Sequence, residues 1–128
     1  RVFNQGRMRR DFTYIDDIVT GVIACADKPA SADPSFDTAA PDPATSWAPH
    51  RLFNIGNSQP VQLLYFIDLL ERALGRQAIR DLRPMQPGDV EATAADTSLL
   101  EAWVGFRPST SIEVGVERFA RWYQASYV

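Results

Sequence analysis

The chain has 128 residues, of which 45% are hydrophobic and 23% charged, and its formal net charge is −3. This length and composition predict one globular domain or part of one, and they exclude a disordered tail, a coiled coil and a collagen-like chain. The acidic balance argues against a nucleic-acid surface, no apolar run approaches the ~20 residues of a membrane span, and one cysteine excludes an internal disulfide or a multi-thiolate metal site.

Residues 1–29 are predicted to form a hairpin followed by a helix. Val2–Asn4 and residues 10–14 are expected to be short strands on either side of a glycine-containing turn. A helix then follows, because apolar residues recur with helical spacing. Asp16 or Asp17 is expected to cap it, since a carboxylate suits both the free N–H groups and the helix dipole.

Residues 30–50 carry prolines among Asp, Ser and Ala, so they predict a long surface loop. That loop is either a tolerated insertion or a functional lid or interface loop. The remaining residues, 51–128, alternate between strand and helix patterns, which is typical of an α/β fold. Strands are expected at 52–55 and 78–83, and helices from Pro60 to Gly75, from Ser98 to Gly105 and from Thr110 onward.

The positions of glycine and lysine exclude two nucleotide motifs from the chain. The seven glycines are too far apart to form G-x-G-x-x-G or a P-loop. Lys28 is the only lysine, and Ala24 stands four residues before it, so a Tyr-x-x-x-Lys pair is also absent. Whatever nucleotide chemistry the chain serves, these residues do not contain a dinucleotide cradle.

Two segments carry side chains suited to a nucleotide. Arg7, Arg9 and Arg10 surround a turn, and a forked, permanently charged guanidinium suits a phosphate, although most exposed arginines are simply solvated. In the loop from Gln86 to Asp89, proline and glycine constrain the backbone. Asp89 can accept two hydrogen bonds from a sugar diol, or it can serve as an Asx-turn residue.

Three motifs resemble those of extended short-chain dehydrogenase/reductase enzymes in the NAD-dependent epimerase/dehydratase family. They are Arg10-Asp11-Phe12-Thr13-Tyr14-Ile15-Asp16-Asp17, Phe53-Asn54-Ile55-Gly56-Asn57-Ser58 and Pro84-Met85-Gln86-Pro87-Gly88-Asp89-Val90. With the terminal Phe119-Ala120-Arg121-Trp122-Tyr123, they cover essentially the whole chain. Relatives acting on UDP-galactose or dTDP-glucose usually carry an arginine where Gln86 stands, so the resemblance favours the bacterial UDP-glucuronate 4-epimerase branch.

The resemblance implies the C-terminal substrate-binding lobe of such an enzyme, with the segment Phe53–Gly56 completing the Rossmann sheet. The family's glycine-rich NAD loop and its Tyr-x-x-x-Lys set would then lie upstream of Arg1. By the same resemblance, Arg10 contacts the diphosphate, Asp89 contacts the uridine ribose, and Gln86 belongs to the same substrate site. No catalytic, cofactor-binding or metal-ligating residue is expected within the chain.

The function implied by the resemblance is that of a UDP-sugar 4-epimerase that uses NAD and acts only when joined to its N-terminal part. We expect the full-length protein to be a cytoplasmic homodimer that takes part in polysaccharide biosynthesis. It should bind a UDP-sugar and neither nucleic acid nor a membrane. We expect this chain alone to be inactive. Two alternatives stay open: a non-catalytic nucleotide-binding or interaction module, and a related sugar dehydratase. The abrupt start at Arg1, without methionine, favours the epimerase over the free-standing module.

Overall fold

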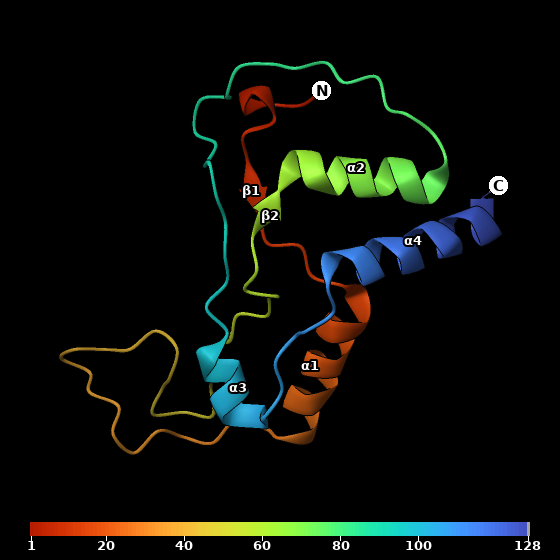
Figure 1. The fold of residues 1–128 in the computed structure, drawn as a ribbon. Coiled ribbons are helices and arrows are strands. Elements are labelled where there is room, and N and C mark those ends of the chain that lie inside the picture. The colour runs from red at the N-terminus through yellow and green to blue at the C-terminus, as the bar shows by residue number, and fades with distance from the viewer. Residues whose placement is uncertain (128) are drawn as a thin grey trace.

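The computed structural model describes residues 1–127, and these residues combine helices with a very small sheet (Figure 1). The helices are α1 (Ile15–Asp27), α2 (Leu63–Leu74), α3 (Ser98–Val104) and α4 (Ile112–Tyr127), and a single 3-10 turn, η1, spans Asn4–Gly6. The strands β1 (Arg9–Arg10) and β2 (Val61–Gln62) pair antiparallel. Among the described residues, no helix has both the length and the apolar character that crossing a membrane requires.

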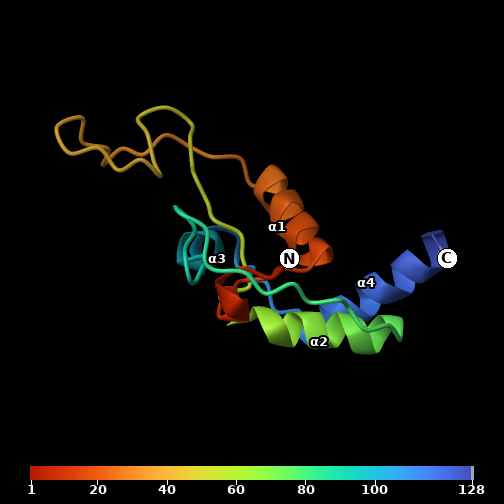
Figure 2. The same cartoon turned by 90° about the horizontal axis from the view of Figure 1, so that it is seen from above.

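Two helix pairs flank an extended central region, and the start of α1 lies beside the start of α4 (Figures 1 and 2). Helix α2 packs against α4, and α1 packs against α3. The central region consists of β1 and β2 together with the extended chain that follows α2. The hydrophobic core is small, and its buried side chains are Val2, Met8, Leu100, Val116 and Ala120.

The predicted N-terminal hairpin is wrong. Val2 forms a parallel bridge with Leu82, and Arg9 bridges Ala92 in parallel while β1 pairs with β2 on its other side. The predicted turn between the two segments does form, because Gln5 and the residues beside it adopt the left-handed conformation, with φ of 53° at Gln5. A turn signal is local, whereas the choice of strand partner depends on segments far along the chain. The two expected strands therefore leave the turn to pair elsewhere.

The predicted helices form, with changes at their ends. Gly75 and Gly105 adopt left-handed conformations, with φ of 66° and 69°, and end α2 and α3 as expected. Helix α1 also forms, but its N-cap is Tyr14, whose side chain makes no capping hydrogen bond. Asp17 lies in the first turn and instead accepts hydrogen bonds from the backbone N–H (2.9 Å) and hydroxyl (3.0 Å) of Thr110. The carboxylate thus joins α1 to the entrance of α4.

The other two predicted strands do not form within the described residues. Residues 52–55 are extended without a strand partner, and in 78–83 only Leu82 makes a bridge. A strand needs a neighbouring edge, and the apolar pattern of 52–55 says nothing of where that edge lies. Helix α2 also begins later than its expected start at Pro60, because Val61–Gln62 pairs with β1 before the helix starts.

Residues 30–50 form the expected loop, which extends away from the helices (Figure 1). Three aspartates organise it locally, since each accepts the backbone N–H of the residue two positions later. These bonds are Asp33 to Ser35 (3.0 Å), Asp37 to Ala39 (2.8 Å) and Asp42 to Ala44 (2.8 Å). Hydrogen bonds from the hydroxyl and backbone of Ser35 lower the pKa of Asp33 to about 2, and Arg51 pairs with the same carboxylate at 3.3 Å.

We predict that this chain by itself associates in solution. Four apolar side chains of α1 are 46–60% exposed: Ile15, Val19, Val22 and Ile23. An apolar patch of this kind favours association because burying it removes apolar area from water. Sedimentation equilibrium should show dimers or larger species, and Val22→Glu should shift them toward monomer. A monodisperse monomer with a cooperative unfolding transition above roughly 60 °C would contradict this prediction.

Candidate functional site

Arg10 and Asp89, which are 79 residues apart in the sequence, form an ion pair. Nη2 of Arg10 lies 3.1 Å from Oδ1 of Asp89, and the two side chains are 24% and 31% exposed. Strand β1 supplies Arg10, and the parallel bridge from Arg9 to Ala92 holds the segment after Asp89 alongside that strand. The structure therefore brings together two of the three residues that the sequence nominated for a substrate site.

The guanidinium of Arg10 makes several other contacts within the chain. Nη1 donates to the backbone carbonyls of Arg9 (2.9 Å) and Glu91 (3.2 Å), while Nη2 also approaches the sulfur of Met8 at 3.7 Å. These contacts fix the plane of the guanidinium beside the Asp89 carboxylate. A ligand phosphate must therefore share or replace them to bind Arg10 bidentately.

The turn from Gln86 to Asp89 positions the carboxylate. The backbone N–H of Asp89 donates to the carbonyl of Gln86 at 3.2 Å, and Gly88 adopts φ of 82°, which only glycine tolerates readily. Oδ1 of Asp89 accepts both the Arg10 contact and the backbone N–H of Val90 at 2.8 Å. Both bonds fall on one oxygen, so Oδ2 is available to another donor. Gln86 itself is exposed and contributes to the turn through its carbonyl.

Asp11 is the residue that the sequence reasoning missed. Its Oδ2 accepts the backbone N–H groups of Ser58 (3.0 Å) and Ala95 (3.2 Å), and its Oδ1 accepts that of Gln59 (3.2 Å). Gly56 permits this approach, because a Cβ there would lie 2.5 Å from the Cβ of Ala95 and 2.9 Å from Oδ2 of Asp11. One carboxylate next to Arg10 therefore ties β1 to two other segments of the central region.

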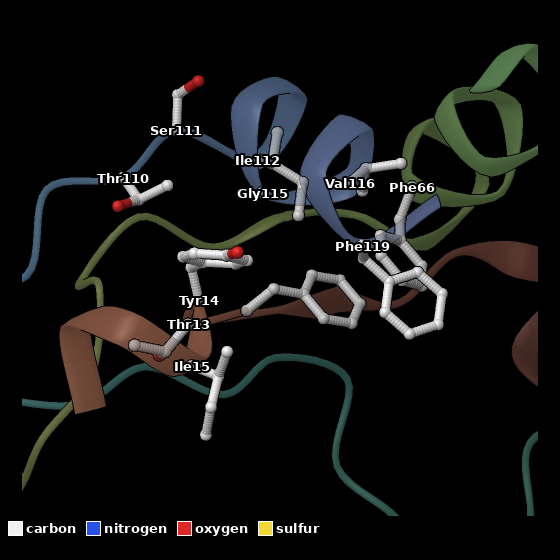
Figure 3. Close-up of a pocket in the computed structure, with 11 residues that line it drawn as sticks. Thr13, Tyr14, Ile15, Phe66, Thr110, Ser111, Ile112, Gly115, Val116 and Phe119 are labelled. Carbon is white, nitrogen blue, oxygen red and sulfur yellow. The ribbon is translucent and has the colours of Figure 1, made fainter. Parts of the chain in front are cut away.

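A pocket among residues 1–127 lies away from the Arg10–Asp89 ion pair. It has a volume of about 300 Å³ and lies between the start of α1, α2 and α4. Figure 3 shows Tyr14 at one end of it and Phe66 and Phe119 at the other, and Phe12 stacks on Phe66 with ring centroids 4.0 Å apart. None of its lining residues is acidic or basic. The pocket therefore offers no charged group to a phosphate, and it does not include the Arg10–Asp89 pair.

Two features that would hold a dinucleotide or a metal ion were sought among residues 1–127, a glycine-rich phosphate cradle and a cluster of ligating side chains. Four of the seven glycines have positive φ, at Gly6, Gly75, Gly88 and Gly105, where each shapes a turn or ends a helix, and Gly21 and Gly115 lie inside helices. None of them forms a phosphate cradle between a strand and a helix. Within residues 1–127, no three His, Cys, Asp or Glu side chains are grouped to hold a metal ion.

No family model matches the chain, but curated proteins do. It is 47% identical over 126 residues to an uncharacterized 37.6 kDa protein of Escherichia coli O111:H-. It is 45% identical over 130 residues to a probable UDP-glucuronate 4-epimerase of Rhizobium meliloti (strain 1021). Each match covers 98% of this chain, yet the chain spans only 38% and 37% of the length of those two relatives.

Solved structures give the same result. A UDP-glucuronic acid 4-epimerase mutant from Bacillus cereus, in complex with UDP-4-deoxy-4-fluoro-glucuronic acid and NAD, matches with a TM-score of 0.71 and 26% identity, over 98% of this chain and 35% of that one. The UDP-glucose 4-epimerase of Thermotoga maritima with UDP-glucose matches with a TM-score of 0.73 over 99% of this chain and 35% of that one; at 21% identity this is a likeness of fold.

The chain thus has the fold of the C-terminal portion of an extended short-chain dehydrogenase/reductase, as the motifs predicted. Within that class, several of its relatives carry the name UDP-glucuronate 4-epimerase, and the resemblance to such enzymes that the sequence predicted is confirmed.

Proposed function

We propose that this chain is the nucleotide-sugar-binding part of an NAD-dependent UDP-glucuronate 4-epimerase. The main support is the juxtaposition of Arg10 and Asp89 at 3.1 Å, in a chain that matches a probable UDP-glucuronate 4-epimerase along 98% of its length. Because the chain spans 37% of that relative, the complete reaction is a property of a longer protein. As the resemblance implies, that protein acts in the cytoplasm as a homodimer.

In this proposal, Arg10 and Asp89 bind the two ends of the diphosphate–ribose unit. The permanently charged guanidinium takes diphosphate oxygens, and the Asp89 carboxylate accepts hydrogen bonds from the ribose hydroxyls. Gln86, on the turn before Asp89, lines the same site without adding a charge. These contacts lie far from the sugar carbon that reacts. Their contribution is to bind and orient the substrate, which lowers the entropic part of the barrier at the reacting centre.

NAD, when bound, supplies the acceptor and donor of hydride for the sugar. The residues that hold it lie mainly outside this chain, because the glycines here form no phosphate cradle. We propose that the exposed face of α1 and the extended segment Phe53–Gly56 pack against that other part, with Phe53–Gly56 adding a strand to its sheet. This accounts for both the exposed apolar side chains of α1 and the missing strand partner.

The proposal is tested by an epimerase assay on the complete gene product and on the 128-residue chain. With UDP-glucuronate and NAD, the complete protein should form UDP-galacturonate, and the chain alone should give no turnover above background. Turnover by the chain alone would contradict the proposal that the reaction requires the rest of the protein. If the complete protein binds UDP-glucuronate without turnover, it is a binding module, and if it dehydrates dTDP-glucose instead, it is a sugar dehydratase.

A further inference from the structure

We propose that the apolar pocket between α1, α2 and α4, together with a smaller pocket that adjoins it, accommodates a neutral side chain from the rest of the longer protein. That side chain combines an apolar body with a hydrogen-bond donor, as tyrosine and tryptophan do. The inference rests on the part of the proposed function that makes this chain a portion of a longer protein. It does not depend on the nucleotide contacts of Arg10 and Asp89.

The two pockets share three lining residues, Phe12, Ser111 and Ile112, so they adjoin at the entrance of α4. The larger pocket, of about 300 Å³, is lined in part by aromatic side chains (Figure 3), and the smaller one, of about 110 Å³, is lined by Asn57 and Glu113 among others. An apolar cavity of about 150 Å³ is enough to bind benzene. The larger pocket therefore has room for an aromatic ring.

Asn57 gives the smaller pocket a hydrogen-bond acceptor without a donor. The residue is only 4% exposed, and its Nδ2 donates to the carbonyl of Thr110 at 3.3 Å. Its Oδ1 is buried and accepts no hydrogen bond from residues 1–127. A buried polar atom that lacks a partner is unfavourable, and native proteins rarely leave one. The side chain that enters the pockets is therefore expected to bring an N–H or O–H group to Oδ1.

The charges around the two pockets disfavour an anion. Among the described residues that line them, none is a lysine, an arginine or a histidine, and Glu113 lines the smaller pocket. Oε1 of Glu113 accepts the hydroxyl of Tyr65 at 2.6 Å, and this bond lowers the pKa of Glu113, so the carboxylate is charged at neutral pH. A phosphate or carboxylate would meet this charge without a cation to bind it. A neutral phenol or indole avoids that repulsion.

The rest of the same protein is the occupant that this surface favours. The chain spans 38% and 37% of two relatives, so more than half of each relative lies outside the match. Exposed apolar side chains continue from the pocket along both bordering helices: Ile15 of α1 is 60% exposed, and Phe119 and Trp122 of α4 are 46% and 54% exposed. A segment of the same polypeptide covers such a surface at a high effective concentration, which a second copy of the protein lacks.

Thiol labelling of the complete protein tests whether the pockets are filled. Ser111→Cys places a thiol where the two pockets adjoin, at a position that is exposed in this chain, and Ser31→Cys places the same thiol on the exposed loop as a matched control. With a maleimide and peptide mapping by mass spectrometry, position 111 should react at least about a hundredfold more slowly than position 31 in the folded protein. After unfolding in urea, the two rates should be similar. Equal rates in the folded protein would overturn the proposal.

Photocrosslinking identifies the occupant. With 4-benzoylphenylalanine in place of Phe119, irradiation of the complete protein should link this position to a peptide of the same polypeptide outside the 128 residues. The product should therefore keep the monomer mass on a denaturing gel. A crosslinked dimer would assign the pockets to a contact between two copies, and crosslinks confined to the 128 residues would show that no outside segment reaches them. Either result would overturn the proposal.

Asn57→Leu and Asn57→Asp, each made in the Ser111→Cys protein, test the hydrogen bond to Oδ1. Both variants lose the bond to the Thr110 carbonyl, but only aspartate keeps an acceptor oxygen. Labelling at position 111 should be about tenfold faster in Asn57→Leu than in Asn57→Asp. Thermal unfolding shows whether each variant is folded. Equal labelling of two folded variants would mean that no donor reaches Oδ1, and the proposed chemistry of the side chain would be wrong.

The epimerase assay separates this inference from the proposed function. If the complete protein forms UDP-galacturonate while position 111 reacts as fast as position 31, the inference fails and the proposed function stands. If position 111 is protected but the protein neither binds nor converts UDP-glucuronate, the proposed function fails and the inference stands.

Discussion

Arg10→Ala in the complete protein should lower the affinity for UDP by roughly ten- to a hundredfold. The substitution removes charge-assisted hydrogen bonds worth about 1.5–3 kcal/mol, and 1.4 kcal/mol corresponds to about a factor of ten. Arg10→Lys should recover only part of the affinity, because an ammonium does not reproduce the planar fork. Isothermal titration calorimetry with UDP measures both effects directly.

Arg7→Ala is the control for this series. Arg7 lies three residues before Arg10, and its side chain is exposed at the end of η1. Its removal should leave UDP affinity nearly unchanged if it is only a solvated arginine. Comparison of unfolding temperatures is also needed, because Arg10 bonds the Glu91 carbonyl as well as Asp89. Wild-type UDP affinity in a folded Arg10→Ala protein would show that Arg10 has no phosphate role.

Asp11→Ala should cause a large loss of stability. It leaves three backbone N–H groups without their acceptor, those of Ser58, Gln59 and Ala95. Hydrogen bonds to a charged group contribute about 1.5–3 kcal/mol each, and hydration of the partly exposed amides offsets some of the loss, so we expect about 3 kcal/mol. Asp11→Asn keeps an acceptor oxygen and should lose about half as much. Urea unfolding followed by circular dichroism measures both.

Asp16→Ala provides the matched comparison. Asp16 is an exposed carboxylate in the first turn of α1. Its replacement by alanine removes only the favourable interaction of the carboxylate with the helix dipole. The expected loss is about 0.3–1 kcal/mol. Equal losses for Asp11→Ala and Asp16→Ala would mean that the three hydrogen bonds of Asp11 do not hold the central region together.

The helices could be predicted from the sequence because their signals are local. The apolar spacing of α1, α2 and α4 and the left-handed glycines after α2 and α3 lie within the elements that they define. The strand pairings could not be predicted in the same way. Val2 pairs with Leu82, and β1 lies between β2 and Ala92, so each pairing joins distant parts of the chain. Turn chemistry near Gly6 predicts that the chain turns, but not what it then pairs with.

The candidate site shows the same contrast between local features, which the sequence predicts, and long-range contacts, which it does not. The chemistry of Arg10 and Asp89 could be predicted from residue type and local backbone constraint. Their pairing could not, because it depends on the bridge that holds the segment after Asp89 beside β1. The role of Asp11 was missed for a related reason. Only the tertiary structure brings the backbone N–H groups of Ser58 and Ala95 to its carboxylate.

The most direct test is a crystal structure of the complete protein with UDP-glucuronate bound. We expect the guanidinium of Arg10 to contact diphosphate oxygens and the carboxylate of Asp89 to contact the ribose hydroxyls. The contact between Nη2 and Oδ1, which measures 3.1 Å in the structure described above, should be broken. A nucleotide bound at another place, with the Arg10–Asp89 pair intact, would contradict the assignment of these residues to the substrate site.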